Sequence, residues 1–111
     1  MEKYLNIRPN NFKDGCMQDV HWPSGAFGYF PSYSMGAIIA AQLFSTLEKE
    51  RLQVREDLSR GDFSYITNWL RSNIHQYGSK YKSKELIQKA TGSALNIENF
   101  KSYLRKKYLE N

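Results

Sequence analysis

Histidine and cysteine are scarce in this sequence, which holds two histidines, His21 and His75, and one cysteine, Cys16, in 111 residues. A single cysteine excludes an internal disulfide bond and fits a reducing compartment, so we expect a cytoplasmic protein. A catalytic zinc ion needs about three protein ligands. Because the two histidines lie far apart in the chain and one cysteine does not complete a ligand set, we expect no metal site and no cofactor bound by this chain.

A long hydrophobic run is also missing. The longest apolar segment extends from Ala37 to Phe44, and Gln42 interrupts it. A membrane-spanning helix needs about 20 predominantly apolar residues, and the charged, aromatic beginning of the chain has no apolar run of signal-peptide length. We therefore expect no membrane partner.

Acidic residues are fewer than basic ones, with 11 aspartates and glutamates against 16 lysines and arginines and a formal net charge of +5. This balance permits weak attraction to acidic surfaces, including nucleic acids. The basic residues are scattered, however, and the densest run, Lys101 to Lys107, is typical of the solvated face of a terminal helix. No base-stacking motif interrupts that run, so we expect no nucleic-acid partner.

Strand pairs, internal repeats and low-complexity tracts are not evident, so the sequence predicts an all-α protein with about four helices. The 41% of hydrophobic and 24% of charged residues are typical of a soluble globular chain, and 111 residues form at most one domain. We expect a single unit over residues 1–111. Its parts are a lead-in over 1–14, a long irregular loop over 15–34 rich in glycine, proline and aromatic residues, and a helical region over 35–111.

Each predicted helix begins near a polar cap, and the first three of the four end near a glycine. The first runs from about Met35 to Leu58, with Ser32 or Ser34 as its cap. Its first half is apolar nearly all round, which indicates burial on more than one side. The other helices are predicted from Asp62 to about Tyr77, from Ser83 to Thr91 and from Asn96 onward, with Gly78 and Gly92 as terminators.

Two of these helices carry an apolar stripe at helical spacing, which predicts a face turned toward the core. The stripe residues are Phe63, Ile66, Leu70 and Ile74, with Trp69 beside them, and Ile97, Phe100, Leu104 and Tyr108 in the last helix. His75 lies near the end of the second helix, and we expect a structural or exposed role for it because no ligand spacing surrounds it.

The irregular loop contains the residues best suited to a functional site. Asp19 precedes His21 by two residues, so an extended backbone places the carboxylate and the imidazole on the same side, where the carboxylate can fix the histidine tautomer. Gln18 adds an amide, while Tyr29 and Tyr33 present aromatic faces with a hydroxyl tip. The alternative from spacing alone is an aromatic mini-core in which Asp19 only caps a turn.

Two blocks of this loop resemble a known protein family. GCMQDVHW over residues 15–22 matches the GxxQDxHW motif of the thermostable (Taq-type) zinc metallocarboxypeptidases, and FGYFPSY over 27–33, followed by AAQL over 40–43, is similar to the family's next block. Two long motifs in the right order are more specific than any single short pattern. The resemblance covers essentially the whole chain, but only the C-terminal portion of the family's enzyme.

The resemblance implies a piece of a larger helical exopeptidase whose zinc is held by a His-Glu-x-x-His helix and a later glutamate. No His-Glu-x-x-His occurs here, so an upstream catalytic half would hold the zinc of the complete enzyme, and this chain alone is expected to be inactive. By the same resemblance, Gln18, Asp19 and His21 line the groove of a peptide substrate near the scissile bond. Tyr29 or Tyr33 then offers a phenol to the oxyanion or to the terminal carboxylate.

The alternative is a non-catalytic helical interaction or dimerisation module. The first half of the long predicted helix has more apolar surface than three short helices easily cover, which would favour a homo-oligomer. A compact monomer in sedimentation would count against this alternative.

Overall fold

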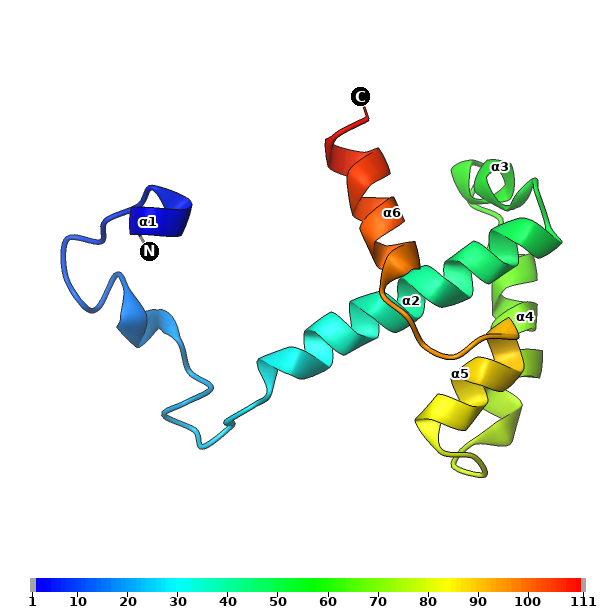
Figure 1. Cartoon of the computed structure of the whole chain (residues 1–111), viewed down its shortest axis with the longest axis horizontal. Coiled ribbons are helices and arrows are strands. Elements are labelled where there is room, and N and C mark those ends of the chain that lie inside the picture. Colours follow the sequence, from blue (N-terminus) through cyan, green and yellow to red (C-terminus); the bar gives the residue numbers. More distant parts are fainter. Residues whose placement is uncertain (1, 111) are drawn as a thin grey trace. The chain divides into compact units, whose positions relative to one another are not determined.

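Helices are the regular elements of the computed structural model, which describes residues 2–110 (Figure 1). They are α1 (Glu2–Leu5), η1 (Cys16–Gln18), α2 (Phe30–Glu50), α3 (Val54–Ser59), α4 (Ser64–Asn73), η2 (His75–Tyr77), α5 (Ser83–Thr91) and α6 (Glu98–Tyr108). The predicted all-α class is confirmed. Met1 and Asn111, the outer ends of the predicted lead-in and helical region, lie outside the described residues. Across residues 2–110, no helix combines the length and the hydrophobicity that crossing a membrane requires.

The chain divides into two compact units, Met1–Tyr33 and Ser34–Asn111. The boundary falls inside α2, whose first residues belong to the first unit and whose remainder belongs to the second. The expectation that residues 1–111 form a single unit stays a prediction.

The first unit consists mainly of turns. None of the residues from 2 to 33 is buried. Its lead-in contains the one-turn helix α1, which ends where Asn6 takes a left-handed backbone with φ 52°. Asparagine tolerates that conformation better than most residues because its short side chain can hydrogen-bond locally. Gly25 and Gly28 have φ angles of 75° and 70°, and their missing Cβ permits the sharp turns between the two loop motifs.

Helix α2 begins at Phe30, earlier than the predicted Met35. Pro31 lies in its first turn, where a missing N–H removes no intrahelical hydrogen bond and the fixed φ suits a helix. Ser32 and Ser34 therefore lie inside the helix, and the prediction that one of them caps it is wrong. Proline set the start of this helix, not a serine cap.

The long helix predicted to run to Leu58 is interrupted after Glu50 and resumes as α3 at Val54. The interruption brings Arg51 Nε within 2.7 Å of Asp57 Oδ2, although the two residues are six positions apart. In a continuous helix that separation would place them about 120° apart around the axis, on different faces. Asp57 is only 3% exposed and also accepts from Arg60, so this buried ion pair accompanies the break that helical periodicity did not predict.

The core of the second unit lies where α2, α4 and α5 meet. Its buried cluster is formed by Leu47, Trp69 and Ala90, one residue from each of these helices. Trp69 is 6% exposed, and its indole N–H donates to Glu50 Oε2 over 2.7 Å, which satisfies its polar atom. Partly buried hydrophobic residues pack around the cluster, namely Leu43, Phe44, Tyr65, Ile66, Leu70 and Ile74.

One residue of the predicted α4 stripe, Phe63, is 59% exposed. It precedes the first residue of α4 and so does not follow the helical register that turns Ile66, Leu70 and Ile74 toward the cluster. The predicted caps are better placed. Asp62 Oδ1 accepts the N–H of Ser64 over 2.9 Å at the start of α4.

Local chemistry also sets the ends of α5 and α6. Gly92 ends α5 in the left-handed conformation with φ 72°, and Gly78 ends η2 with φ 50°. Asn96 Oδ1 accepts the N–H of Glu98 over 3.1 Å at the start of α6. The boundaries predicted at Gly92 and Asn96 are confirmed. The helix predicted to run from Asp62 to about Tyr77 ends earlier, at Asn73, and Gly78 terminates the separate turn η2 instead.

Gln42 fastens α2 to the segment between α5 and α6. Its side chain is buried, and its Nε2 lies 3.0 Å from Thr91 Oγ1 and 3.1 Å from Ser93 Oγ, while its Oε1 accepts the N–H of Asn96 over 3.0 Å. Gln42, which interrupts the apolar run of α2, therefore forms polar contacts with residues about 50 positions further along the chain. Thr91, for example, is 49 positions away.

Helix α6 buries none of its residues. Ile97, Leu104 and Tyr108, predicted to face the core, are 44%, 37% and 63% exposed. The prediction of a core face for this helix is wrong within the described chain, because α6 packs only through its partly buried first turn. An apolar helix face is left open.

Candidate functional site

The candidate site is built around Asp19 and His21 in the first unit. Asp19 follows the η1 turn, and its Oδ1 accepts the backbone N–H of His21 over 2.8 Å and lies 3.0 Å from His21 Nδ1. One carboxylate oxygen therefore closes a turn and orients the ring at the same time. The spacing of the two residues predicted the contact between their side chains. The alternative, in which Asp19 caps a turn, corresponds to the hydrogen bond from the backbone N–H of His21.

Hydrogen bonds from the backbone N–H and then the imidazole of His21 lower the pKa of Asp19 below its usual value. The carboxylate is thus ionised at neutral pH and acts only as an acceptor. Nδ1 of His21 must then carry the proton that it donates, which directs Nε2 toward any ligand. The imidazole is part-buried, with 27% of its side-chain surface exposed.

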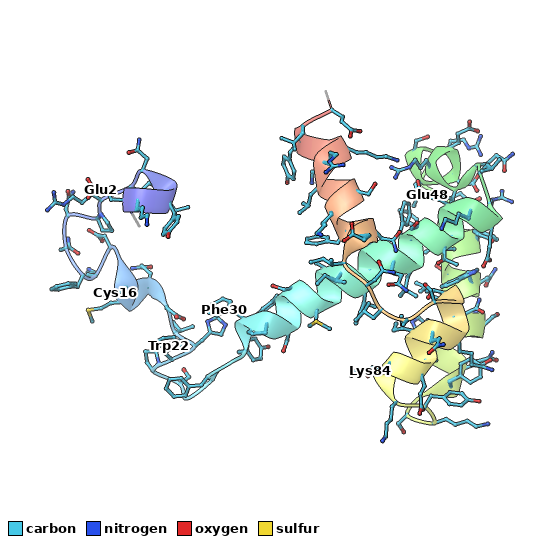
Figure 2. The ribbon with its side chains drawn as sticks, viewed as in Figure 1. Glu2, Cys16, Trp22, Phe30, Glu48 and Lys84 are labelled. Carbon is cyan, nitrogen blue, oxygen red and sulfur yellow. The ribbon has the colours of Figure 1, made fainter. Side chains whose placement is uncertain are left out.

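Aromatic rings surround this imidazole. The ring of Phe30 lies 4.4 Å from that of His21 between centroids, at an interplanar angle of 51°, and the ring of Tyr29 lies 5.3 Å away at 31°. Phe30 is labelled at the start of α2 in Figure 2, with Trp22 at the beginning of the intervening turn. Both rings are tilted against the imidazole, and Asp19 contacts its Nδ1, so Nε2 is the ring nitrogen left for a polar contact.

A turn between the motifs brings these rings to the histidine. The N–H of Ala26 donates to the carbonyl of His21 over 2.8 Å, and the N–H of Gly25 donates to that of Trp22 over 2.9 Å. Trp22 and Phe27 pack across the turn with ring centroids 5.7 Å apart. The aromatic side chains and the backbone turn therefore fix the position of His21 together.

Two tyrosines extend the cluster. The rings of Tyr29 and Tyr33 meet edge to face at 5.3 Å. Hydrogen bonding with Tyr29, followed by burial, raises the pKa of the Tyr33 phenol above its usual value. Tyr33 therefore remains a neutral hydroxyl, able to donate a hydrogen bond. Tyr29 and Tyr33 are 49% and 60% exposed, so both are accessible to a ligand.

Gln18 is the predicted site residue that the structure does not bring to this cluster. Its amide donates to the carbonyl of Lys13 over 2.7 Å and braces the preceding turn. Phe30, in contrast, has the shortest ring distance to His21 and was not among the predicted site residues. Its signal in the sequence was its place within the FGYFPSY block.

The donor set of this site does not fit a catalytic metal ion. Asp19 and His21 offer two donors, and about three protein ligands are needed. Within residues 2–110, no group of three or more histidine, cysteine, aspartate or glutamate side chains is placed to hold a metal. The chemistry that these residues support is hydrogen bonding and stacking with a polar ligand, through one imidazole nitrogen and two phenols.

Known proteins similar to this chain form a consistent group. A sequence model of the family described as carboxypeptidase Taq (M32) metallopeptidase matches residues 1–108. Thermostable carboxypeptidase 1 of Pyrococcus furiosus is 40% identical over 109 residues, which cover 98% of this chain and 22% of that protein. The protein of the same name from Thermus thermophilus is 43% identical over 110 residues, which cover 96% of this chain and 22% of that protein.

Solved structures agree with these relatives. Metallocarboxypeptidase 1 of Trypanosoma cruzi is similar with a TM-score of 0.88 and 41% identity, over 97% of this chain and 23% of that chain. A carboxypeptidase structure from Pyrococcus furiosus has a TM-score of 0.86 and 40% identity, over 97% of this chain and 22% of that chain. The chain thus spans about a fifth of the length of the curated relatives that it matches.

Proposed function

Because this chain belongs to the carboxypeptidase Taq (M32) metallopeptidase family, as its loop motifs predicted, we propose that its first unit forms one wall of a carboxypeptidase substrate groove. The observation that carries the proposal is the Asp19–His21 pair beneath the rings of Tyr29 and Phe30. The names of the relatives, which are carboxypeptidases, supply the substrate class. The substrate is a peptide that loses its C-terminal residue.

His21 and the two tyrosines bind the peptide in this proposal. Asp19 occupies Nδ1 of His21, so Nε2 forms the contact with the peptide near the scissile bond. Tyr29 or Tyr33 donates its phenol hydrogen to the terminal carboxylate, or to the carbonyl oxygen that gains negative charge during hydrolysis. Tyr33 keeps its phenol hydrogen at neutral pH, which donation requires, and its raised pKa extends this protonated range to more alkaline pH.

Gln18 takes part only if it changes partner. Its amide would have to leave the carbonyl of Lys13, which it contacts over 2.7 Å, to reach a substrate. Both groups are exposed, so water can satisfy the carbonyl when the amide leaves. We therefore retain Gln18 as a groove residue whose contact forms on binding.

The zinc of the complete carboxypeptidase is, in this proposal, held outside these 111 residues. The support is the incomplete donor set at Asp19 and His21 and the missing His-Glu-x-x-His sequence. A chain without the metal has no means of activating water for peptide hydrolysis. The isolated chain is therefore expected to release no C-terminal amino acids from peptides.

A chimera provides the test. The segment of the Thermus thermophilus relative that matches this chain is replaced by residues 1–111, and release of C-terminal amino acids is measured with zinc present. The proposal expects an active chimera and a silent isolated chain. An isolated chain whose activity is abolished by a chelator would refute it.

Single substitutions in the chimera then test the named residues. Loss of one donor to the developing oxyanion lowers kcat by about 100- to 1,000-fold, so Tyr29→Phe or Tyr33→Phe is expected to produce a fall of that order. His21→Ala is expected to reduce kcat/KM, whereas His75→Ala, which removes an exposed imidazole, serves as the matched control. Equal effects of the two histidine substitutions would contradict the proposed role of His21.

The helical interaction or dimerisation module stays a second prediction. The observation in its favour is the number of exposed large hydrophobic side chains, which includes Leu52 at 83% and Leu109 at 79%. Sedimentation of the isolated chain at micromolar concentration tests it, because a stable dimer favours the module. The expected cytoplasmic location and the expected lack of a nucleic-acid partner also stay predictions.

A further inference from the structure

A groove in the second unit lies between α2 and α6 and has a volume of about 890 Å³. Its α2 side is formed mainly by small residues, Ala37, Ala40 and Ala41. Its α6 side includes the rings of Phe100 and Tyr103. Small side chains let another helix axis approach closely, because interaxial distance depends on the residues at the contact.

Apolar side chains of α6 at and beside the groove are only partly covered by the described chain. Helix α6 has no buried residue, and Leu104 and Tyr103 are 37% and 45% exposed. Ala40 on the opposite wall is exposed as well. An apolar surface of this kind normally marks a contact with another protein segment.

We infer that this groove seats an amphipathic helix from the part of the carboxypeptidase fold that lies outside these 111 residues. The inference rests on the proposed function, since it takes the partner from the same enzyme. Relatives are about five times longer than the matched segment, which covers 22% of them. Solved family members retain the conformation of this segment with TM-scores of 0.86 and 0.88 while carrying the additional chain.

The charges at the rim indicate the chemistry of that helix. Lys106 and Lys107 line one side of the groove, whereas Glu48 on the other side is already paired with Arg55. Lys107 donates to the hydroxyl of Tyr103 over 3.1 Å, which keeps its ammonium at the rim. The seated helix therefore has an apolar stripe flanked by acidic side chains, which complement the lysines.

A second copy of this chain fits the groove less well. The net charge of +5 makes two copies repel, and the lysine-rich rim adds to that repulsion. An acidic helix removes the same repulsion. The charge balance thus favours binding of an acidic helix from the rest of the enzyme over binding of a second copy of this chain.

Substitution at Ala40 tests the inference in two contexts, the isolated chain and the chimera described above. Ala40→Lys replaces an exposed residue in the isolated chain, so its melting curve, followed by far-UV circular dichroism, is expected to be unchanged. In the chimera, the seated helix buries the new ammonium beside two lysines, and the melting temperature is expected to fall by roughly 5 °C or more. Gln88→Lys adds the same charge at an exposed position outside the groove and is the matched control.

Lys106→Glu provides a second measurement. It reverses a rim charge and is expected to lower the melting temperature of the chimera at low salt, with a smaller effect at high salt. The isolated chain is expected to tolerate it, because Lys106 is exposed.

Each remaining outcome overturns the inference. If the chimera tolerates Ala40→Lys as well as it tolerates Gln88→Lys, no helix occupies the groove. If the chimera does not fold, the rest of the enzyme supplies no helix that fits the groove. If the isolated chain forms a dimer that Ala40→Lys disrupts, the groove binds a second copy of this chain instead. The proposed function is judged separately, because a chimera with the expected Ala40→Lys effect and no peptidase activity would refute the function alone.

Discussion

Replacing Gln42 by leucine removes the polar contact that holds α2 to the segment after α5. Nε2, which carries two protons, lies 3.0 to 3.3 Å from four oxygens, namely Thr91 Oγ1, Ser93 Oγ, Ser93 O and Ala94 O. Its Oε1 is the acceptor for the N–H of Asn96 over 3.0 Å. Leucine has a similar volume, so the substitution tests the hydrogen bonds and not the packing.

The expected cost follows from the groups left behind. The N–H of Asn96 would lose its acceptor in a part-buried hydrogen bond, and a shielded N–H without an acceptor costs about 1 to 3 kcal/mol. Ser93 and Ala94 are exposed, so their oxygens can form hydrogen bonds with water and add little to the cost of the substitution. Leucine recovers part of the loss by apolar burial. The net change in the free energy of unfolding is about 1 kcal/mol, or roughly 4 to 8 °C in melting temperature for a unit of this size.

Denaturant unfolding measures this change through the fluorescence of Trp69, which lies in the core and contacts Glu50. A Trp22→Phe background removes the other, exposed indole. Gln88→Leu is the matched control, because Gln88 is an exposed glutamine on α5. Equal stability of Gln42→Leu and Gln88→Leu would refute the reasoning, since the buried hydrogen bonds would then contribute nothing net.

Gln42→Glu sharpens the same test. The glutamate keeps an oxygen for Asn96 but loses both N–H donors and places a carboxylate among four oxygens. The folded state therefore raises the pKa of this carboxyl, and the variant gains stability as the pH falls. A variant whose stability does not depend on pH would contradict this account.

Further predictions concern an ion pair, the site and two glycines. Asp57→Asn is expected to lower the denaturation midpoint fully above about pH 4 and progressively less below it, because hydrogen bonds from its arginine partners lower the pKa of Asp57 and that stabilisation disappears as the pH falls through the folded value. A loss that does not shrink on acidification would contradict this prediction. Asp19→Asn is expected to mix the tautomers of His21, measured by nitrogen-15 NMR, and an unchanged spectrum would exclude the orienting role. Gly92→Ala, at φ 72° with open space for a Cβ, is expected to cost about 1 kcal/mol in denaturant unfolding. Gly36→Ala inside α2 also meets open space but is expected to stabilise by up to about 1 kcal/mol, so a shared sign would refute the backbone argument.

Local sequence signals predicted most of the helix boundaries. Asp62, Gly92 and Asn96 act through atoms of their own turn, with hydrogen bonds or dihedral angles that span only a few residues. The Asp19–His21 contact is equally local, with a separation of two residues. The start of α2 was mispredicted for an equally local reason, because proline rather than serine begins that helix.

Contacts between distant segments were not predictable from periodicity. The pattern of residues 35–58 favoured one continuous helix, but the Arg51–Asp57 pair lies across a break between α2 and α3. Gln42 looked like an interruption of an apolar run, and its partners lie 49 to 54 residues away. The apolar stripe of α6 was identified correctly as a pattern, but the described chain leaves it exposed.

The sequence by itself determined the helical class, the family and the contact between Asp19 and His21, because caps, turns and two contiguous motifs act over short stretches of chain. Only the tertiary structure decided that the ring of Phe30 lies closer to the ring of His21 than that of Tyr29 does. The structure also decided that Gln18 donates to the carbonyl of Lys13 and that Gln42 joins α2 to the chain before α6. These contacts depend on which surfaces meet after folding. Which partner a side chain contacts depends on the burial and hydrogen bonding of the whole folded unit. No local sequence pattern specifies these.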